Sequence, residues 1–406
     1  LSSAGRGPAH AGRLSTGEAA MSAERLRLAL ATFYPARPDE VIGGIDSVAV
    51  NLVQGLAALP DLELHVVSTR PEVVHDVTYS ANGVTFHALA SPPQRLIPNL
   101  FANIGRVSRV LRAIQPDVVH AHNADYAVAA LRLGLPTIYT VHGLAGRELR
   151  QPAPPQQRLA LILLLALERL ALRRAPHVAA LSAFGEAYLR PHTAGQIHRV
   201  DNPVSTAFFA LPPAAQSHRL IAIGSIVPLK GQLTLVAALA LLHQQEPAVT
   251  LRCLGSIADR GYHAQVMQAI ARHGLQEIIS VTGLAPPADV VAALGDSAVL
   301  LHPSRHDHVP MAVAEAMAAG RPVVATRAGG IPGLVSDGVT GYLVPVGDAA
   351  ALAGRTLALL RDADLRQTLG AQARQVALAR FLPTVVAARY HSLYRLAAGS
   401  PSAPGR

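Results

Sequence analysis

Residues 298–326 of this 406-residue chain have the pattern of a strand, a loop, a short helix and a second strand. The two strands are short apolar runs at 298–302 and 322–326, and residues 310–319 between them are mostly small and apolar. The turn at Gly329-Gly330 is expected to lead into another helix. Short apolar runs joined by a helix are typical of a βαβ unit, because parallel strands are buried on both faces. Strands and helices alternate in this way from about residue 25 onward, so the sequence predicts an α/β fold with parallel sheets.

The loop and helix of this unit place two carboxylates beside free backbone amides. Pro310 suits a helix start, where its missing N–H would be unpaired anyway, and Gly320 suits the left-handed residue after the helix. Asp307 then lies in the loop and Glu315 in the helix, at the carboxyl end of the preceding strand. Ligands of doubly wound sheets bind at this edge, where helix-start amides suit an anion and carboxylates suit sugar hydroxyls. The arrangement predicts a site for a phosphorylated sugar.

This segment resembles the donor-binding signature of retaining glycosyltransferases of the GT-B fold, in particular glycosyltransferase family 4. The signature reads P-S-x-x-E-x-F-G-x-x-x-x-E-A-M-A-x-G-x-P-V-V-A-T-x-x-G-G. Asp307 stands at the position of the first Glu, and Val309-Pro310 replaces Phe-Gly. The resemblance covers about residues 25–396. The matching positions are Pro303, Ser304, Glu315, Ala316, Met317, Ala318, Gly320, Pro322, Val323, Val324, Ala325, Thr326, Gly329 and Gly330.

The resemblance implies a fold and a role for each part of the segment. The fold is GT-B, an α/β architecture in which two Rossmann-like doubly wound domains face each other across a cleft. Glu315 is implied to accept hydrogen bonds from the ribose of a nucleotide-sugar. Asp307 and the backbone of Val309, Pro310 and Met311 are implied to hold the donor sugar.

Lys230 is the single lysine among the 35 basic side chains of the chain. It stands in Pro-Leu-Lys-Gly at a predicted strand-to-helix junction, where a compact ammonium suits a phosphate in a way that arginine does not always reproduce. The family pattern G-R-L-x-x-x-K-G has its lysine here, but its arginine is replaced by Ser225. Either Lys230 and nearby backbone amides suffice for the diphosphate, or another cation such as Arg305 substitutes.

The N-terminal half contributes glycines and histidines to the predicted cleft. Gly43-Gly44 precedes a predicted helix, so backbone amides there can approach a phosphate closely. The resemblance supports this role and implies that His142, at a strand end, reaches the donor sugar or the acceptor. His120 and His122, in the preceding strand, are interpreted as structural.

Domain organisation follows from the length and the resemblance. A chain of 406 residues suits two domains, which are expected to be an acceptor domain at 21–205 and a donor domain at 206–380. Residues 381–406 are expected to form a helix that crosses back to the first domain and a frayed tail. Residues 1–20 are small, polar and rich in glycine, and are expected to be a disordered extension without the apolar core of a secretory signal.

Two further positions in the donor domain carry expectations from the family. Gly283-Leu284 follows a predicted strand, at the place where the family holds the nucleotide base through backbone groups. Gly333 stands where the family often has Glu, so the chain departs from the pattern there.

Composition excludes several other classes of protein. A hydrophobic fraction of 50% with 15% charged residues argues against disorder. The formal charge of +9 is spread evenly and lacks aromatic interleaving, so nucleic-acid binding is not expected. The one cysteine, Cys253, lies in an apolar run, is interpreted as a core residue, and fits a reducing cytoplasm.

The apolar run at 159–172 leaves two interpretations open. It is shorter than the ~20 apolar residues that cross a bilayer, and it contains Glu168 and Arg169. It is either a core helix packed on the sheet or a helix partly exposed to a membrane, with Arg158 and Arg173 at its rim. We therefore expect a cytoplasmic protein, with peripheral contact at the inner face of the membrane as the open alternative.

These features predict a retaining glycosyltransferase that moves a sugar from a UDP- or GDP-sugar to a glycan, lipid-linked or small-molecule acceptor. Asp307, Lys230 and His142 are the predicted catalytic residues. The resemblance implies that the departing phosphate takes the acceptor proton. A cationic side chain and helix dipoles are available for the diphosphate, so no metal and no cofactor besides the nucleotide-sugar are expected. The alternative is a non-catalytic nucleotide-sugar-binding or scaffold protein of the same fold. Motif spacing argues against an epimerase or an inverting transferase.

Overall fold

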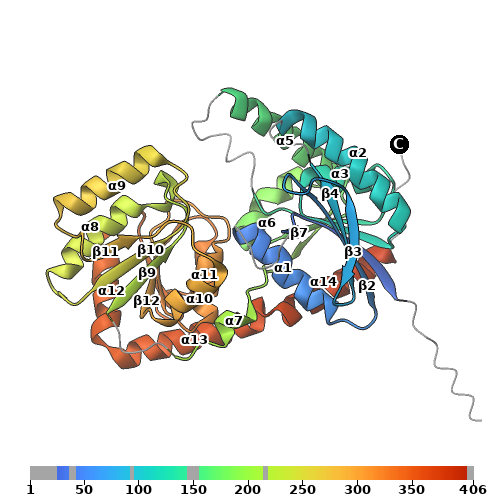
Figure 1. Cartoon of the computed structure of the whole chain (residues 1–406). Helices are drawn as coiled ribbons and strands as arrows, with labels where there is room; N and C mark the ends of the chain where they lie inside the picture. The colour runs from blue at the N-terminus through green and yellow to red at the C-terminus, as the bar shows by residue number, and fades with distance from the viewer. Residues whose placement is uncertain (1–24, 36–42, 92–95, 144–154, 214–217, 400–406) are drawn as a thin grey trace, which may run out of the picture.

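The computed structural model describes residues 25–35, 43–91, 96–143, 155–213 and 218–399, which form two α/β domains (Figure 1). The first has an eight-stranded sheet in the order β3-β4-β2-β1-β5-β6-β7-β8, and the second a six-stranded sheet in the order β11-β10-β9-β12-β13-β14. Neighbouring strands are parallel except for the antiparallel pair β3–β4. The predicted fold class, two doubly wound Rossmann-like domains, is confirmed.

The first sheet consists of eight strands with helices on both faces. Its strands are β1 (Leu26–Ala31), β2 (Leu62–Arg70), β3 (Val77–Ala81), β4 (Val84–Ala90), β5 (Val118–Ala121), β6 (Thr137–Thr140), β7 (His177–Ala180) and β8 (Gln196–Arg199). Its helices are α1 (Gly44–Ala57), α2 (Leu96–Ile114), α3 (Ala124–Leu131), α5 (Pro155–Arg174), α6 (Ala183–Leu189) and the 3-10 turn η1 (Arg190–His192), followed by the short α7 (Thr206–Phe209).

The second sheet is covered in the same way. Its strands are β9 (Arg219–Ile223), β10 (Thr250–Leu254), β11 (Ile279–Val281), β12 (Val299–His302), β13 (Val323–Thr326) and β14 (Gly341–Val344). The helical segments are η2 (Pro228–Lys230), α8 (Gln232–His243), α9 (Arg260–Arg272), α10 (Pro287–Gly295), α11 (Met311–Ala318), η3 (Ile331–Gly333), α12 (Ala349–Arg361), α13 (Ala363–Phe381) and α14 (Pro383–Ala398).

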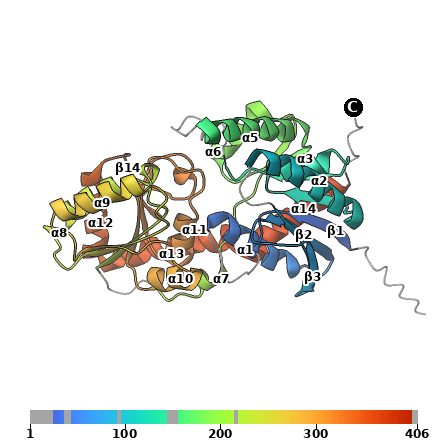
Figure 2. The ribbon, with the colours of Figure 1, turned by 45° about the horizontal axis from the view of Figure 1, so that its top comes forward.

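Each sheet separates two apolar cores. In β1, Ala29 and Ala31 pack toward α2 and α3, whereas Leu28 and Leu30 pack toward α1 and α14. The second sheet likewise has α8, α9 and α12 on one face and α10, α11 and α13 on the other, as the tilted view in Figure 2 helps to follow. Burial on both faces explains why the central strands are continuous apolar runs in the sequence.

The C-terminal helix α14 packs on the first domain, against α1, β5 and β6 (Figure 1). The Tyr394 hydroxyl lies 2.8 Å from Nδ1 of His120 on β5. Two segments of the chain connect the domains, and they lie side by side. The Val204 N–H of one segment donates to the Phe381 carbonyl of the other at 2.8 Å. Asp201 beside it accepts hydrogen bonds from Arg380, at 2.7 and 3.1 Å, which ties the two passages together.

Several elements are absent from the sequence prediction, among them β3, β8, α3, α9 and α10, and one predicted element is wrong. The edge strand β3 has every residue exposed and β8 is only partly buried, so neither has the apolar run that marks a parallel strand. The short α3 was also missed. The helix predicted after Gly329-Gly330 is only the single 3-10 turn η3. Pro310 caps α11 from outside with ψ 111°, and Gly320 has the predicted left-handed φ of +67°.

Gly55 gives a test of how closely α14 approaches α1. A Cβ built at Gly55 would lie 2.3 Å from the Pro383 carbonyl oxygen, so a methyl group must push the two helices apart. Gly354 in α12 has no atom within 4 Å of such a Cβ. We expect Gly55→Ala to destabilise the protein by about 1–3 kcal/mol through overpacking. Gly354→Ala should stabilise it by up to about 1 kcal/mol through helix propensity.

Melting temperatures of the two glycine variants, measured beside wild type, check this prediction. Opposite shifts from the same chemical change would show that α14 is docked in solution. An equal rise in melting temperature for both variants would contradict the close contact between Gly55 and Pro383.

Candidate functional site

An ion-pair cluster is centred on Asp307, which lies in the loop between β12 and α11. Lys230 Nζ is 2.5 Å from Asp307 Oδ2, and Nε2 of His302, the last residue of β12, is 3.0 Å from the same oxygen. Burial by itself would raise the pKa of Asp307, but the hydrogen bond from His302 and the charge of Lys230 hold it well below its usual range. Asp307 is therefore ionised, and its charge is balanced within the site.

The loop that carries Asp307 is fixed by contacts with the Gly-Gly turn and with η2. The Gly330 N–H donates to the Asp307 carbonyl at 2.8 Å. The Ser304 hydroxyl bonds the Leu229 carbonyl at 3.1 Å, and the Thr326 hydroxyl donates to the Ser304 carbonyl. Serine, threonine and glycines of the signature therefore have a common structural purpose, which is to hold the acidic loop in one conformation.

Gly329 is a position of close approach in this arrangement. It has a left-handed φ of +55°, and a Cβ there would lie 2.0 Å from the Asp307 carbonyl oxygen. Gly338 has a similar φ of +74° with nothing within 4 Å of a Cβ. We expect Gly338→Ala to lower the free energy of unfolding by about 1 kcal/mol, because alanine is strained at a left-handed φ. Gly329→Ala should have the same strain and lose an additional ~1–3 kcal/mol, because its Cβ collides with the Asp307 carbonyl. Melting temperatures of the two variants measure the difference, and equal losses would refute the collision.

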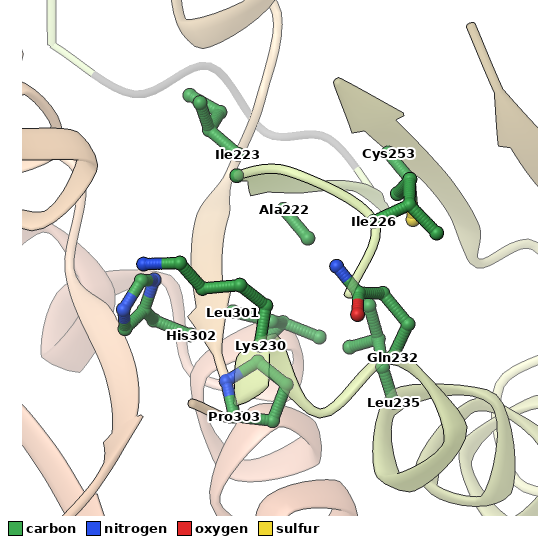
Figure 3. A pocket seen from close by; sticks show the side chains of 11 residues that line it. Ala222, Ile223, Ile226, Lys230, Gln232, Leu235, Cys253, Leu301, His302 and Pro303 are labelled. Carbon is green, nitrogen blue, oxygen red and sulfur yellow. The ribbon is translucent and has the colours of Figure 1, made fainter. Parts of the chain in front are cut away.

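Lys230 and His302 border a small pocket at the carboxyl ends of β9, β10 and β12. Figure 3 shows the Lys230 side chain extending alongside the His302 ring, with apolar side chains and Cys253 deeper in the cavity. Burial raises the pKa of the Cys253 thiol to about 12, so the thiol is protonated and Cys253 is a core residue, as predicted.

Glu315 lies on α11, in the helix that follows the acidic loop. Its side chain is partly buried, and burial raises its pKa to about 7. Among the residues that the structure describes, none donates a hydrogen bond to this carboxylate or pairs with it. A desolvated carboxylate without a donor is costly, so its binding capacity is available to hydroxyl groups of a ligand.

The predicted glycine loop meets the donor side of the cleft. Gly43 is the N-cap of α1 and has open space around it. A Cβ at Gly44 would lie 3.5 Å from the Met311 side chain, and the Asn202 amide lies 3.6 Å from the Met311 sulfur. Two candidate positions more than half the chain apart, Gly44 and Met311, are thus in contact across the domain boundary.

His142 also reaches the donor domain. Its carbonyl oxygen is 3.2 Å from Nδ1 of His308, the residue after Asp307, and its ring packs on that of His122. Burial, together with the nearby His308, lowers the pKa of His142 to about 4, so its imidazole is neutral at neutral pH. Nε2 of His142 is buried with no hydrogen-bond partner among the described residues.

The remaining candidates lie around the ends of β9 to β11. The Ser225 hydroxyl is 3.0 Å from that of Ser256. Gly283 has φ +73°, and its carbonyl accepts from the Gly255 N–H, while the Leu284 side chain is 56% exposed. Arg305 does not join the Asp307 cluster; its charge acts on Tyr262, where it opposes the effect of burial on the tyrosine pKa.

Two residues of the site were not foreseen from the sequence as site residues. His302 supplies a hydrogen bond to Asp307, and His308 bridges to the first domain, with its Nε2 so close to Gly185 that a Cβ there would be 2.4 Å away. His308 occupies a variable position of the signature, so nothing in the pattern marks it. His302 could have been noticed as a polar residue ending an apolar strand. No group of three or more potential metal ligands is found within the described part of the chain.

Two doubly wound domains, with a charged cluster at strand ends and a glycine loop opposite it, define the GT-B class of glycosyltransferases. Family models narrow this class: Glycosyltransferase Family 4 matches residues 42–208, and Glycosyl transferases group 1 matches residues 205–376. The chain belongs to glycosyltransferase family 4, and the resemblance noted in the sequence is confirmed.

Individual relatives agree with the family. The D-inositol 3-phosphate glycosyltransferase of Jonesia denitrificans is 29% identical over 371 residues, which cover 82% of this chain and 86% of that protein. For other curated relatives the matched segment spans only 36% and 39% of their own length.

Solved structures show the same fold. A sucrose-phosphate synthase from Thermosynechococcus elongatus has a TM-score of 0.75 and 23% identity, over 93% of this chain and 100% of that chain. HepE of Anabaena, in complex with UDP and glucose, has a TM-score of 0.71 and 19% identity, over 92% and 100% of the two chains.

Proposed function

We propose that this protein transfers a sugar from a nucleotide-sugar to an acceptor, with retention of the anomeric configuration. The observation that carries the proposal is the Lys230–Asp307–His302 cluster, which lies at the carboxyl ends of the donor-domain strands. The glycine loop of the first domain contacts Met311, at the start of the helix after this cluster. The complex of HepE with UDP and glucose supports UDP as the carrier.

Each candidate residue has a proposed role in donor binding. Lys230 and the amides at Gly43-Gly44 balance the charge of the diphosphate, and Glu315 accepts hydrogen bonds from the ribose. Asp307 and the backbone of Val309, Pro310 and Met311 hold the sugar. Backbone groups of Gly283 and Leu284 contact the base, with Ser225 near the phosphates.

The proposed chemistry needs no protein acid or base. The bond from the anomeric carbon to the diphosphate oxygen breaks while the acceptor oxygen bonds to the same face of that carbon. The acceptor proton passes to an oxygen of the departing diphosphate. Lys230 stabilises the charge that develops on the leaving group, which is the electrostatic contribution that usually dominates such a step.

We assign His142 a proposed role on the acceptor side of this reaction. Its imidazole is neutral, and its buried Nε2 has no partner among the described residues. We propose that a hydroxyl of the donor sugar or of the acceptor completes this hydrogen bond. The acceptor class is a glycan, a lipid-linked sugar or a small polyol such as the inositol phosphate named for the relative from Jonesia. The proposed location is the cytoplasm.

A thermal-shift screen tests the donor site directly. Purified protein is melted with UDP, GDP, ADP and their common sugar conjugates, because a ligand of the native state raises the melting temperature by mass action. We expect one nucleotide to give a shift that Lys230→Ala abolishes. An absence of any shift would overturn the proposal.

A non-catalytic nucleotide-sugar-binding protein is the second candidate. The observations that favour it are Ser225 in place of a cation and the ion pair in which Asp307 balances the charge of Lys230. Slow hydrolysis of the bound donor without acceptor, measured as released nucleotide, distinguishes the two. An enzyme hydrolyses its donor and loses this activity in Asp307→Asn, whereas a binding protein gives a thermal shift without turnover.

A further inference from the structure

Helix α5 exposes a continuous face on the outer side of the first domain, away from α14 (Figures 1 and 2). The opposite side of the helix, with Ala160, Ala171 and Leu172, is buried and packs over α3 and α2. The apolar run is therefore core on one side and exposed on the other, and contact of the exposed side with a membrane stays a prediction. The exposed residues are Arg158, Leu159, Ile162, Ala166, Arg169, Leu170, Arg173 and Arg174.

The exposed face combines large apolar side chains with arginines. Leu159 is 52% exposed, Ile162 51% and Leu170 37%. Their spacings of three positions, from Leu159 to Ile162, and eight positions, from Ile162 to Leu170, place them along one side of the helix. Arginines stand at both ends of this row. An apolar row bounded by cations is the pattern of a helix that lies in the interface of a membrane.

A polar cavity lies at the C-terminal end of the same face. Arg169 and Arg173 of α5 line it together with His192, Thr193 and their neighbours in the turn after α6. The Thr193 hydroxyl donates to the Leu172 carbonyl at 2.7 Å, which holds this turn against the helix. No carboxylate among the described residues forms an ion pair with either arginine.

Two arginines that share a cavity without a counter-ion attract an anion, and planar guanidinium groups suit a phosphate. The cavity adjoins the apolar row, so an anion bound there would stand at the level where α5 meets a bilayer. We propose that this face, defined as α5 together with the η1 turn, docks on an anionic membrane, and that a lipid phosphate occupies the Arg169–Arg173–His192 cavity.

An anionic membrane as the partner agrees with other properties of the chain. The formal charge of the chain is +9, and each arginine close to an anionic surface adds to the attraction. Within the described ranges, no helix is long and apolar enough to cross a membrane. The proposal does not depend on catalysis, because none of these residues belongs to the candidate donor site.

Vesicle co-sedimentation tests the proposal on the full chain. We expect binding to vesicles of phosphatidylcholine with phosphatidylglycerol and none to phosphatidylcholine alone. Arg169→Gln/Arg173→Gln should weaken binding at least about tenfold, through loss of two surface charges. Ile162→Ser should weaken it severalfold without changing its dependence on salt. The matched control Arg260→Gln/Arg272→Gln removes two exposed charges from α9 of the other domain and should bind as wild type does.

The other outcomes decide against the proposal. If the α9 control loses as much vesicle binding as the Arg169/Arg173 variant, net charge alone drives binding. Equal binding to neutral vesicles would remove the role of the cavity. Glycerol phosphate could raise the melting temperature of wild type and not that of the Arg169/Arg173 variant. If the protein then binds no vesicles, the cavity is a site for a soluble phosphate instead. An unchanged melting temperature of each variant, measured without ligand, shows that the fold is intact.

Discussion

We expect the Lys230→Ala variant to lose at least about tenfold in kcat/KM, which is the loss of one charge-assisted contact of roughly 1.5–3 kcal/mol. Lys230 is the cation that the structure holds beside Asp307 and His302, and Ser225 stands where the family has a second one. The diphosphate of the donor would then have a single side-chain counter-charge. Initial rates at varied donor concentration, or donor hydrolysis if the acceptor is not known, measure the effect.

Two comparison variants separate this role from a general effect of charge. Arg260→Ala removes an exposed cation from α9 and should leave the rate within about twofold, because exposed charges contribute little. Arg305→Ala tests the candidate substitute for the missing arginine. Since Arg305 acts on Tyr262 and not on Asp307, we expect a smaller loss than from Lys230→Ala. Full activity of Lys230→Ala would remove Lys230 from the site assignment.

The free protein already contains the ion pair that a donor must reorganise. Asp307 has a depressed pKa, so its ion pair stabilises the fold above the unfolded pKa and loses this effect as pH falls through the lower folded value. The same pair keeps Lys230 next to the position proposed for the sugar. A diphosphate that draws Lys230 away would leave Asp307 with His302 and free one of its lone pairs for a sugar hydroxyl.

The fold could be predicted where burial leaves a pattern in the sequence. Central strands such as β12 and β13 are short apolar runs because helices cover both of their faces. The edge strand β3 pairs on one side only and is exposed, so its sequence has no comparable run. The helix expected after Gly330 failed for another reason: the turn is stabilised by contacts with Asp307, and these are tertiary.

The candidate site could be predicted where fixed spacing encodes local geometry. Asp307, Glu315 and the glycines all lie within one βαβ unit, so their separation along the chain limits their separation in space. The contact of Gly44 with Met311 and that of His142 with His308 join separate domains, and no local pattern encodes them. His308 in particular depends on the docking of the domains, which only three-dimensional packing reveals.

The second large effect concerns Glu315, for which we expect opposite changes in activity and stability. Glu315→Gln and Glu315→Ala should each lower kcat/KM at least about tenfold if the ribose hydroxyls donate to this carboxylate. Since burial raises the pKa of Glu315 to about 7, the binding form is lost as pH falls below that value. The donor KM of wild type should therefore rise from pH 8 to pH 6, while that of Glu315→Gln should stay level.

The raised pKa of Glu315 also has a consequence for the free protein. A carboxyl whose folded pKa exceeds its unfolded value destabilises the fold as pH rises from the unfolded pKa to about 7, and the full cost persists above it. Glu315→Gln removes this cost, so we expect it to be more stable than wild type by about 1–3 kcal/mol at pH 8 and equal to it near pH 4. Glu277→Gln, at an exposed site, is the control and should change neither property. A Glu315→Gln variant that is both inactive and less stable at pH 8 would mean that the carboxylate has a structural partner, and its assignment to the donor ribose would be wrong.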